Sequence, residues 1–173
     1  MPAEPYETFD DFVAAAATRL LRAAVFLVSD RQLAEDLVQS AFERTARHWR
    51  RLARTGNPEA YARRVLVNLA IDDGRRRRRR PLLLGGGSDD LERIGGTAPD
   101  RGIAELELRD LVERSLAALP PRQRAVLVLR YWCDLSEREI AADLGISTGT
   151  VKSQAARALA RLQQDLSLRE EAR

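Results

Sequence analysis

Residues 81–103 have no helical periodicity, and they divide the chain into two parts. This stretch contains the glycine run Gly85-Gly86-Gly87, a second pair at Gly95-Gly96 and a proline at Pro99. Because glycine is conformationally free and proline lacks the amide donor that a helix needs, we expect a flexible linker here. The sequence therefore predicts two small helical modules on a tether, residues 1–80 and residues 104–173.

The first module has apolar residues at the spacing of amphipathic helices. Asp30 is a candidate N-cap for one such helix. Asn57-Pro58 is predicted to open another, with Asn57 as its cap and Pro58 at its first position. The apolar rows are Phe9, Phe12, Val13, Leu20, Leu27 and Val28, on one helix or a broken pair; Ala34, Leu37, Val38, Ala41, Phe42, Thr45 and Trp49; and Tyr61, Val65 and Leu69.

The second module carries the pattern of a helix-turn-helix, which follows a helix predicted from Pro121 to Tyr131. Ser136 and Glu139 form a capping box, and Gly145 stands where a helix can end in a left-handed residue. Ser147 is then placed to cap the next helix. Two short helices joined by a glycine turn are typical of a DNA-reading helix-turn-helix, although such hairpins also occur in helical bundles. Since no strand pattern is present, the predicted fold class is all-α.

The last helix has an apolar face and a polar face. Val151 and Ala155 belong to its apolar stripe, and small hydroxyls alternate with long cations on the other side. In a helix-turn-helix that polar side faces base edges and phosphates. The residues predicted to contact DNA here are Ser147, Thr148, Thr150, Lys152, Ser153 and Arg157.

A second basic surface is predicted at the end of the first module. The net charge is only +3, but six consecutive arginines occupy residues 75–80. Such a run can be a solvated tail, yet here it follows a helix whose exposed face is expected to carry Arg63, Arg64 and Asn68. That context favours a surface that follows phosphates. Tyr61 could stack on an unpaired base, and a place in the core is at least an equal alternative for it.

An earlier helix has a different exposed row. Asp36, Gln39 and Glu43 stand at i, i+3 and i+7, so one face carries acidic and amide groups. This face does not favour DNA. It suits a basic protein partner, or simply water.

Several functional classes are excluded by the sequence. No run of 18 apolar residues exists and the acidic N-terminus lacks an apolar stretch, so we expect a soluble, cytoplasmic protein without a membrane span. With one cysteine, Cys133, and one histidine, His48, neither a disulfide nor a structural metal site is expected. The acidic pairs at residues 10–11, 72–73 and 89–90 belong to unrelated segments, so no catalytic site and no cofactor are predicted.

The order of these segments resembles a known family. AEDLVQSAFERTARHW, then PEAYARRVLVNLAIDDGRRRRRR, a linker, and LPPRQRAVLVLRYWCDLSEREIAADLGISTGTVKSQAARALARL are similar to an extracytoplasmic-function sigma factor of bacterial RNA polymerase, of the actinobacterial kind. The resemblance covers residues 8–165. It implies a region 2 helical bundle in residues 1–80, a linker in residues 81–103 and a region 4 helix-turn-helix in residues 104–173.

The resemblance also implies roles for residues at matching positions. Region 2 would bind the β′ clamp helices of core RNA polymerase, region 4 would meet the β flap, and promoter DNA would be single-stranded at −10 and duplex at −35. A loop at residues 54–57 would hold a flipped base. The polymerase contacts implied are Asp36, Gln39, Phe42 and Glu43. The −10 contacts implied are Arg54, Asn57, Tyr61, Arg64, Asn68, Arg75 and Arg76.

Some features depart from the family pattern or leave alternatives. Gln154 and Ala156 stand where many members carry Arg and a larger side chain, so the −35 sequence may differ; Gly74 is expected to weaken the end of its helix. An anti-sigma partner is an expectation of the resemblance. Without one, the monomer's two modules should fold against each other. The alternative function is a conventional helix-turn-helix regulator that does not bind core polymerase.

Overall fold

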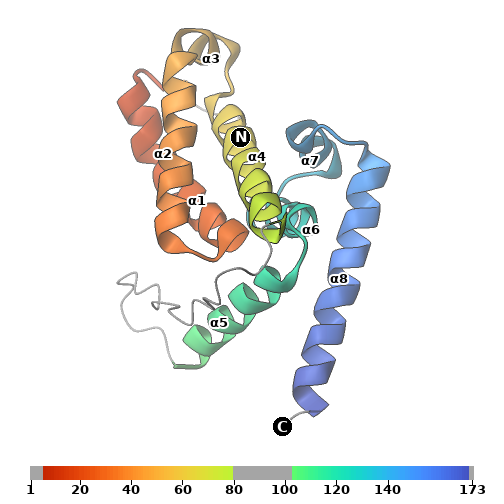
Figure 1. Ribbon diagram of the computed structural model, residues 1–173. Coiled ribbons are helices and arrows are strands. Elements are labelled where there is room, and N and C mark those ends of the chain that lie inside the picture. The colour runs from red at the N-terminus through yellow and green to blue at the C-terminus, as the bar shows by residue number, and fades with distance from the viewer. Residues whose placement is uncertain (1–5, 80–102, 172–173) are drawn as a thin grey trace.

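The structure is a computed structural model that describes residues 6–79 and 103–171, and it is built from helices (Figure 1). Within these residues there is no β-strand, which confirms the all-α prediction. The predicted linker lies outside the described residues, apart from Ile103, which begins a helix. The helices are α1 (Phe9–Val28), α2 (Arg31–Arg47), α3 (Trp49–Thr55), α4 (Pro58–Arg79), α5 (Ile103–Ala118), α6 (Pro121–Leu127), the π-helical η1 (Val128–Trp132), α7 (Glu137–Leu144) and α8 (Thr148–Glu171).

The predicted helix starts in the first module are confirmed by their hydrogen bonds. The Asp30 carboxylate accepts from the amide of Leu33 at 3.0 Å and begins α2. The Asn57 side chain accepts from the amide of Ala60 at 3.0 Å and begins α4. Each bond satisfies one of the amides that a helix start leaves without a partner.

Two sequence-based boundaries were wrong. The helix expected to continue to Trp49 breaks at His48, and this break places the Trp49 ring on Phe9, with ring centroids 5.4 Å apart. Arg54 belongs to the end of α3 rather than to a loop, because α3 continues to Thr55 and is capped by Gly56, where φ is +79°. The helix expected from Pro121 to Tyr131 is confirmed to within one residue, although its part after Leu127 is the π-helical η1.

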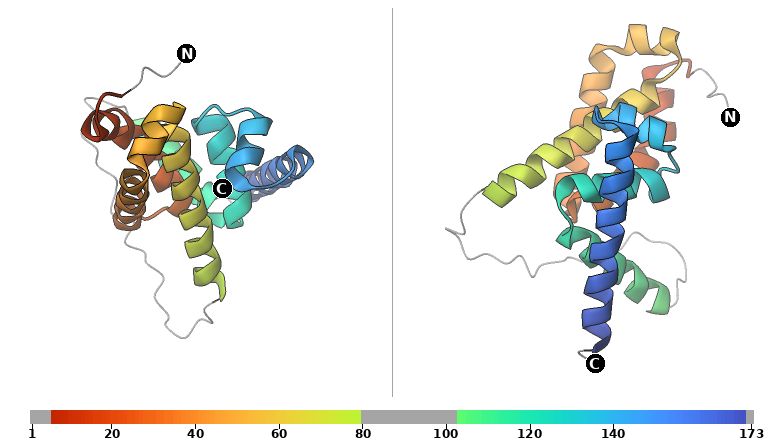
Figure 2. Two further views of the ribbon diagram at one scale, coloured as in Figure 1. Left: turned by 90° about the horizontal axis from the view of Figure 1, so that it is seen from above. Right: turned by 90° about the vertical axis from the view of Figure 1, so that its right-hand side faces the viewer.

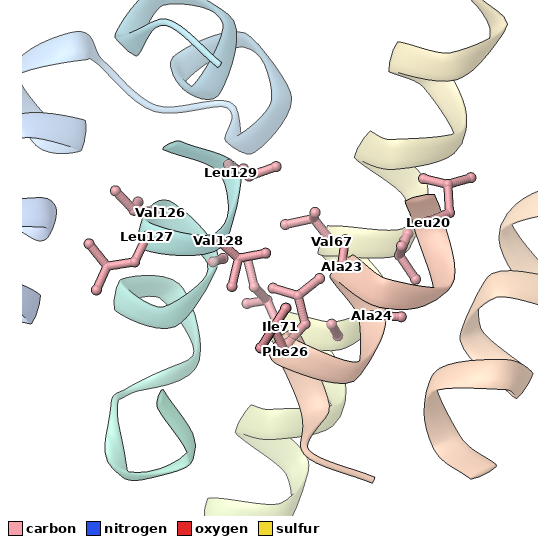
Figure 3. Close-up of a cluster of buried hydrophobic side chains, with 14 of the residues drawn as sticks. Leu20, Ala23, Ala24, Phe26, Val67, Ile71, Val126, Leu127, Val128 and Leu129 are labelled. Atoms are coloured by element: carbon pink, nitrogen blue, oxygen red, sulfur yellow. The ribbon is translucent and has the colours of Figure 1, made fainter. Parts of the chain in front are cut away.

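The two modules share one hydrophobic core instead of standing apart. Phe26 of α1 and Val67 of α4 meet Val128 and Leu129, which come from the second module (Figure 3). All four side chains are buried. The expectation that the two modules fold against each other is confirmed, and α4 lies between its own bundle and the helix-turn-helix (Figures 1 and 2).

Gly74 has a different role from the one expected. The helix does not end there, because α4 continues through Gly74 to Arg79. A Cβ atom at this position would lie 2.6 Å from Cγ of Pro121, the first residue of α6. Glycine therefore permits the close approach of α4 and α6, and with it the contact between the modules.

Among the described helices, none is both long enough and apolar enough to cross a membrane.

Candidate nucleic-acid and polymerase interfaces

The helix-turn-helix is formed by α7, a turn and α8, as predicted. The Ser136 hydroxyl and the Glu139 carboxylate make the reciprocal bonds of a capping box, and these bonds lower the pKa of Glu139. Gly145 ends α7 with φ at +62°, and the Ser147 hydroxyl accepts from the amide of Thr150 at 3.1 Å to begin α8. Val151 and Ala155 are buried, so the helix is held by the stripe that the sequence indicated.

The outer face of α8 presents the predicted DNA contacts unevenly. Thr148, Lys152, Ser153 and Arg157 are exposed. Thr150 is half-buried, and its hydroxyl lies 2.8 Å from that of Ser147. The Ser153 hydroxyl donates to the carbonyl of Thr150 at 3.0 Å. Because these hydroxyls are engaged within the helix, Lys152 and Arg157 are the long groups best placed to reach a ligand.

The predicted −10 contacts follow one side of α4 and the end of α3. Asn57, Asn68, Arg75 and Arg76 are exposed on α4 or at its cap, and Arg54 is exposed on α3. At about 100° per residue, Asn57, Asn68 and Arg75 fall on one stripe together with Tyr61 and Arg64, whereas Arg76 lies about 100° away from it. The sequence therefore indicated a common surface for most of this set, but not for Arg76.

Tyr61 is the aromatic residue of this stripe, and it is half-buried. Its ring meets the His48 ring edge-on, with centroids 5.7 Å apart. A ring held in this way keeps one part accessible, which is what stacking on a base requires.

The neighbouring side of α4 faces the second module, and here the prediction for Arg63 was wrong. Arg63 is not on the exposed face, because its Nε donates to the Asp143 carboxylate of α7 at 2.8 Å. Only 15% of the Arg63 side chain and 3% of the Asp143 side chain are accessible. Arg64 lies at the border of the two stripes, 3.6 Å from the same carboxylate, and about half of its side chain remains exposed.

Arg124 forms a second connection between the modules. Its guanidinium donates to the Leu27 carbonyl at the end of α1, at 2.8 Å, and to the Ala117 carbonyl at the end of α5, at 2.6 Å. Burial, with a smaller contribution from the charge of Arg78, lowers the pKa of Arg124 to about 10. At neutral pH the side chain therefore remains a cation.

The acidic and amide row of α2 is exposed at Asp36, Gln39 and Glu43. Phe42 is half-buried, and its ring meets the Phe12 ring of α1 edge-on at 5.7 Å. An open groove of about 430 Å³ lies between α1 and α2, with Phe42, Gln39 and Glu43 on its wall. A mostly apolar groove beside carboxylates can receive an amphipathic basic partner.

No metal site is present among the described side chains, which contain no group of three or more potential ligands. Cys133 packs half-buried against the core, and burial raises the pKa of its thiol to about 11. A neutral thiol is a poor nucleophile, so Cys133 acts here as a small packing residue.

Comparison with protein families assigns both modules. Residues 7–80 match "Sigma-70 region 2" and residues 109–162 match "Sigma-70, region 4". The chain belongs to the sigma-70 family of RNA polymerase sigma factors. As a sigma factor it resembles the RNA polymerase sigma-E factor of Streptomyces avermitilis, with 37% identity over 162 residues that cover 94% of this chain and 87% of the relative.

A second relative and two solved structures agree. The sigma factor is 36% identical to the ECF RNA polymerase sigma factor SigL of Mycobacterium tuberculosis over 88% of this chain and 86% of SigL. It is similar to RpoE of Bartonella quintana, solved in complex with the anti-sigma factor NepR, with a TM-score of 0.67, 25% identity and 92% and 96% of the two chains covered. It is also similar to CnrH, solved with the cytosolic domain of CnrY, with a TM-score of 0.60, 26% identity and 92% and 88% covered.

The extracytoplasmic-function resemblance of the sequence is thereby confirmed, in its actinobacterial form. The protein is a transcription factor of the sigma type and not a conventional helix-turn-helix regulator. The sequence analysis missed Asp143 and Arg124, and it did not predict the packing role of Gly74. Gly74 carried the one available signal, because a glycine inside a helical pattern can mark a close helix contact.

Proposed function

We propose that this sigma factor binds core RNA polymerase through α2, reads the −35 element with α8, and captures the opened −10 strand on α4 and the end of α3. The observation that carries the proposal is the separation of charge over these surfaces. The α2 row Asp36, Gln39 and Glu43 exposes carboxylates and an amide, whereas Arg75, Arg76 and Arg157 are exposed on the helices assigned to DNA. The sigma factor would perform no chemistry itself, and it would act in the cytoplasm with the polymerase.

In this proposal each DNA element is recognised by a different kind of contact. Lys152 and Arg157 of α8 approach duplex DNA, with the start of the helix adding amide contacts to a phosphate. The α4 stripe offers amides at Asn57 and Asn68, an accessible ring at Tyr61 and guanidinium groups beyond them. Amides and a ring recognise unpaired bases, and the arginines follow the backbone.

We also propose the domain boundaries given by the sequence, with region 2 in residues 1–80, a linker in residues 81–103 and region 4 in residues 104–173. The two solved relatives were captured with an anti-sigma factor or with the cytosolic domain of CnrY. An inhibitor of the same kind is therefore a reasonable partner for this chain, and the protein is expected to be a monomer when it is free.

The experiment is a reconstitution with bacterial core RNA polymerase. The full chain should co-elute with the core enzyme and support run-off transcription from the DNA upstream of its own operon. Tight duplex binding by the protein alone, without any binding to core polymerase, would contradict the proposal.

A matched pair of variants tests the α2 surface. Asp36→Ala removes an exposed carboxylate of the α2 row and should weaken polymerase binding while leaving DNA binding nearly unchanged. Asp10→Ala, which removes an exposed carboxylate of α1, is the control and should leave the affinity unaltered. Equal polymerase affinity for wild type and Asp36→Ala would overturn the assignment of this surface.

A further inference from the structure

A cavity of about 240 Å³ lies where the two domains meet near the end of α4. It is lined by both domains: Ser29 follows α1, Asp73, Arg77 and Arg78 belong to α4, and Arg124 belongs to α6. The cavity is smaller than the groove between α1 and α2. The side chains just named make part of its wall polar, whereas the groove is mostly apolar.

The arginine run divides between two sides of α4. Arg77 and Arg78 line the cavity. Ala70, Asp73 and Gly74, which precede them by one to two turns of α4, line it as well. Arg75 does not line the cavity and belongs to the stripe assigned to DNA. The run is therefore not a uniform phosphate-binding surface, because two of its members turn toward the other domain.

The lining residues carry excess positive charge. Arg77 is compensated, since its Nε lies 2.8 Å from the Asp73 carboxylate and its Nη2 lies 3.9 Å from that of Asp30. Arg78 makes no ion pair with any residue that the structure describes. Arg124 donates to backbone carbonyls, which carry no net charge. Two cations therefore remain without a carboxylate partner.

Hydrogen-bond donors in the cavity are also left over. The hydroxyl of Ser29 and the Nε of Arg124 are buried without a partner among the described residues. Leaving such buried groups unpaired is energetically unfavourable. The positive charges of Arg78 and Arg124 repel each other, which is one reason for the lowered pKa of Arg124. Both features would be relieved by a ligand that only accepts hydrogen bonds and carries negative charge.

We propose that this cavity binds a small phosphate anion, inorganic phosphate or pyrophosphate, between Arg78 and Arg124 with the Ser29 hydroxyl as a further donor. Guanidinium groups suit phosphate oxygens because they can form two parallel hydrogen bonds. Because the lining comes from both domains, the anion stabilises their packed arrangement by mass action. This inference concerns the free protein, so it does not depend on the proposed function.

The test is isothermal titration calorimetry on the full chain with phosphate and with pyrophosphate, at constant ionic strength. We expect binding to one site. Arg78→Gln should weaken it by about tenfold or more, as expected for a lost charge-assisted hydrogen bond. The control is Arg75→Gln, which removes the same charge from the same run outside the cavity and should change the affinity by less than about twofold. The anion that binds more tightly, phosphate or pyrophosphate, is then identified as the ligand of the cavity.

A second readout measures the domain contact itself. Pyrophosphate should raise the unfolding temperature of the wild type and of Arg75→Gln, and much less that of Arg78→Gln or Ser29→Ala. Ser29→Ala keeps every charge, so it tests the hydroxyl alone. The absence of saturable binding would overturn the proposal. The proposal would also be overturned if Arg78→Gln and Arg75→Gln weakened pyrophosphate binding equally and DNA displaced pyrophosphate. That result would assign Arg78 to the DNA surface.

Discussion

The two helices that we propose to read DNA are held in different ways. Helix α8 packs mainly on α6 and α7 of its own domain, and its polar side is exposed at Lys152 and Arg157. Helix α4 packs on both domains, since Val67 and Ile71 join the shared core and Arg63 reaches across to α7 (Figure 3). One helix is free to meet DNA, and the other is partly engaged inside the molecule.

In the proposed function, this difference would limit access to α4 more than access to α8. Arg64 belongs to the predicted −10 stripe, yet it lies 3.6 Å from Asp143 of the other domain. A strand captured on α4 would compete with that contact between domains, whereas the contact of Lys152 with Glu137 at 3.5 Å lies within one domain. Moreover, the −10 and −35 elements are separate stretches of a duplex that rises about 3.4 Å per base pair, so the two surfaces must reach different places on the DNA. We therefore expect region 2 to separate from region 4 before both elements are bound.

The largest expected effect comes from breaking the buried ion pair. Asp143→Ala leaves Arg63 without its carboxylate, and removal of one partner from a buried pair costs about 3–5 kcal/mol. Urea unfolding should show this loss. The loss should be accompanied by separate unfolding of the two domains, because the pair joins them.

The control for Asp143→Ala is Glu137→Gln on the same helix. Glu137 pairs with Arg130 and Lys152 at 3.3 Å and 3.5 Å, but these contacts are more exposed and lie within one domain. We expect a change of less than about 1 kcal/mol. Similar losses for the two variants would mean that Asp143 has no special role at the domain contact.

The next effect concerns the close approach at Gly74. Gly74→Ala places a Cβ atom 2.6 Å from Pro121 Cγ, so the contact between α4 and α6 must shift. Overpacking of this kind costs about 1–3 kcal/mol, and small-angle scattering should detect a larger radius of gyration.

A glycine of α8 gives the matched comparison for Gly74. At Gly149 the nearest contact of a new Cβ would be Ser147 Oγ at 3.8 Å, so nothing is displaced. Gly149→Ala should stabilise the protein by up to about 1 kcal/mol through helix propensity. An unchanged radius and increased stability for Gly74→Ala would show that the domains do not depend on this glycine.

The third effect is on DNA alone. Arg157→Ala on α8 should weaken binding to a −35 duplex by about 1–3 kcal/mol if it contacts a base, and should reduce the salt dependence if it contacts a phosphate. Fluorescence anisotropy at several salt concentrations distinguishes the two cases. Arg114→Ala on α5 removes another exposed arginine and should leave the affinity within about twofold of wild type. Equal weakening by both variants would contradict a specific role for α8.

The smallest effect is local to the start of α7. Ser136→Ala removes the capping box and should cost about 1 kcal/mol in thermal unfolding at neutral pH. The bonds to Ser136 lower the pKa of Glu139, so this stability is present above the ordinary pKa of the carboxyl and disappears as the pH falls through the lowered value. The difference between wild type and Ser136→Ala should therefore shrink in acid. A difference that stays constant down to pH 2 would exclude the carboxylate.

The sequence predicted what is determined locally. The caps at Asp30, Asn57 and Ser136 depend on residues within three positions, so their signals are complete in the sequence. The buried stripe of α8 could also be predicted, because its apolar residues recur at the period of an α-helix.

Features that depend on the other domain could not be predicted. Arg63 and Asp143 are 80 positions apart, and nothing near either residue identifies the other as its partner. The break at His48 likewise depends on the packing of the Trp49 ring against Phe9 of α1. Helical periodicity indicates which face of α4 is apolar, but it does not indicate that a second domain covers the neighbouring face.

The most direct test measures the separation of the two domains. Spin labels at Arg51→Cys on α3 and Gln163→Cys on α8, in a Cys133→Ala background, would report the distance by pulsed electron paramagnetic resonance. We predict one narrow distance distribution in the free protein and a longer distance after addition of core RNA polymerase and promoter DNA. A broad distribution in the free protein, or an unchanged distance in the transcription complex, would contradict the account.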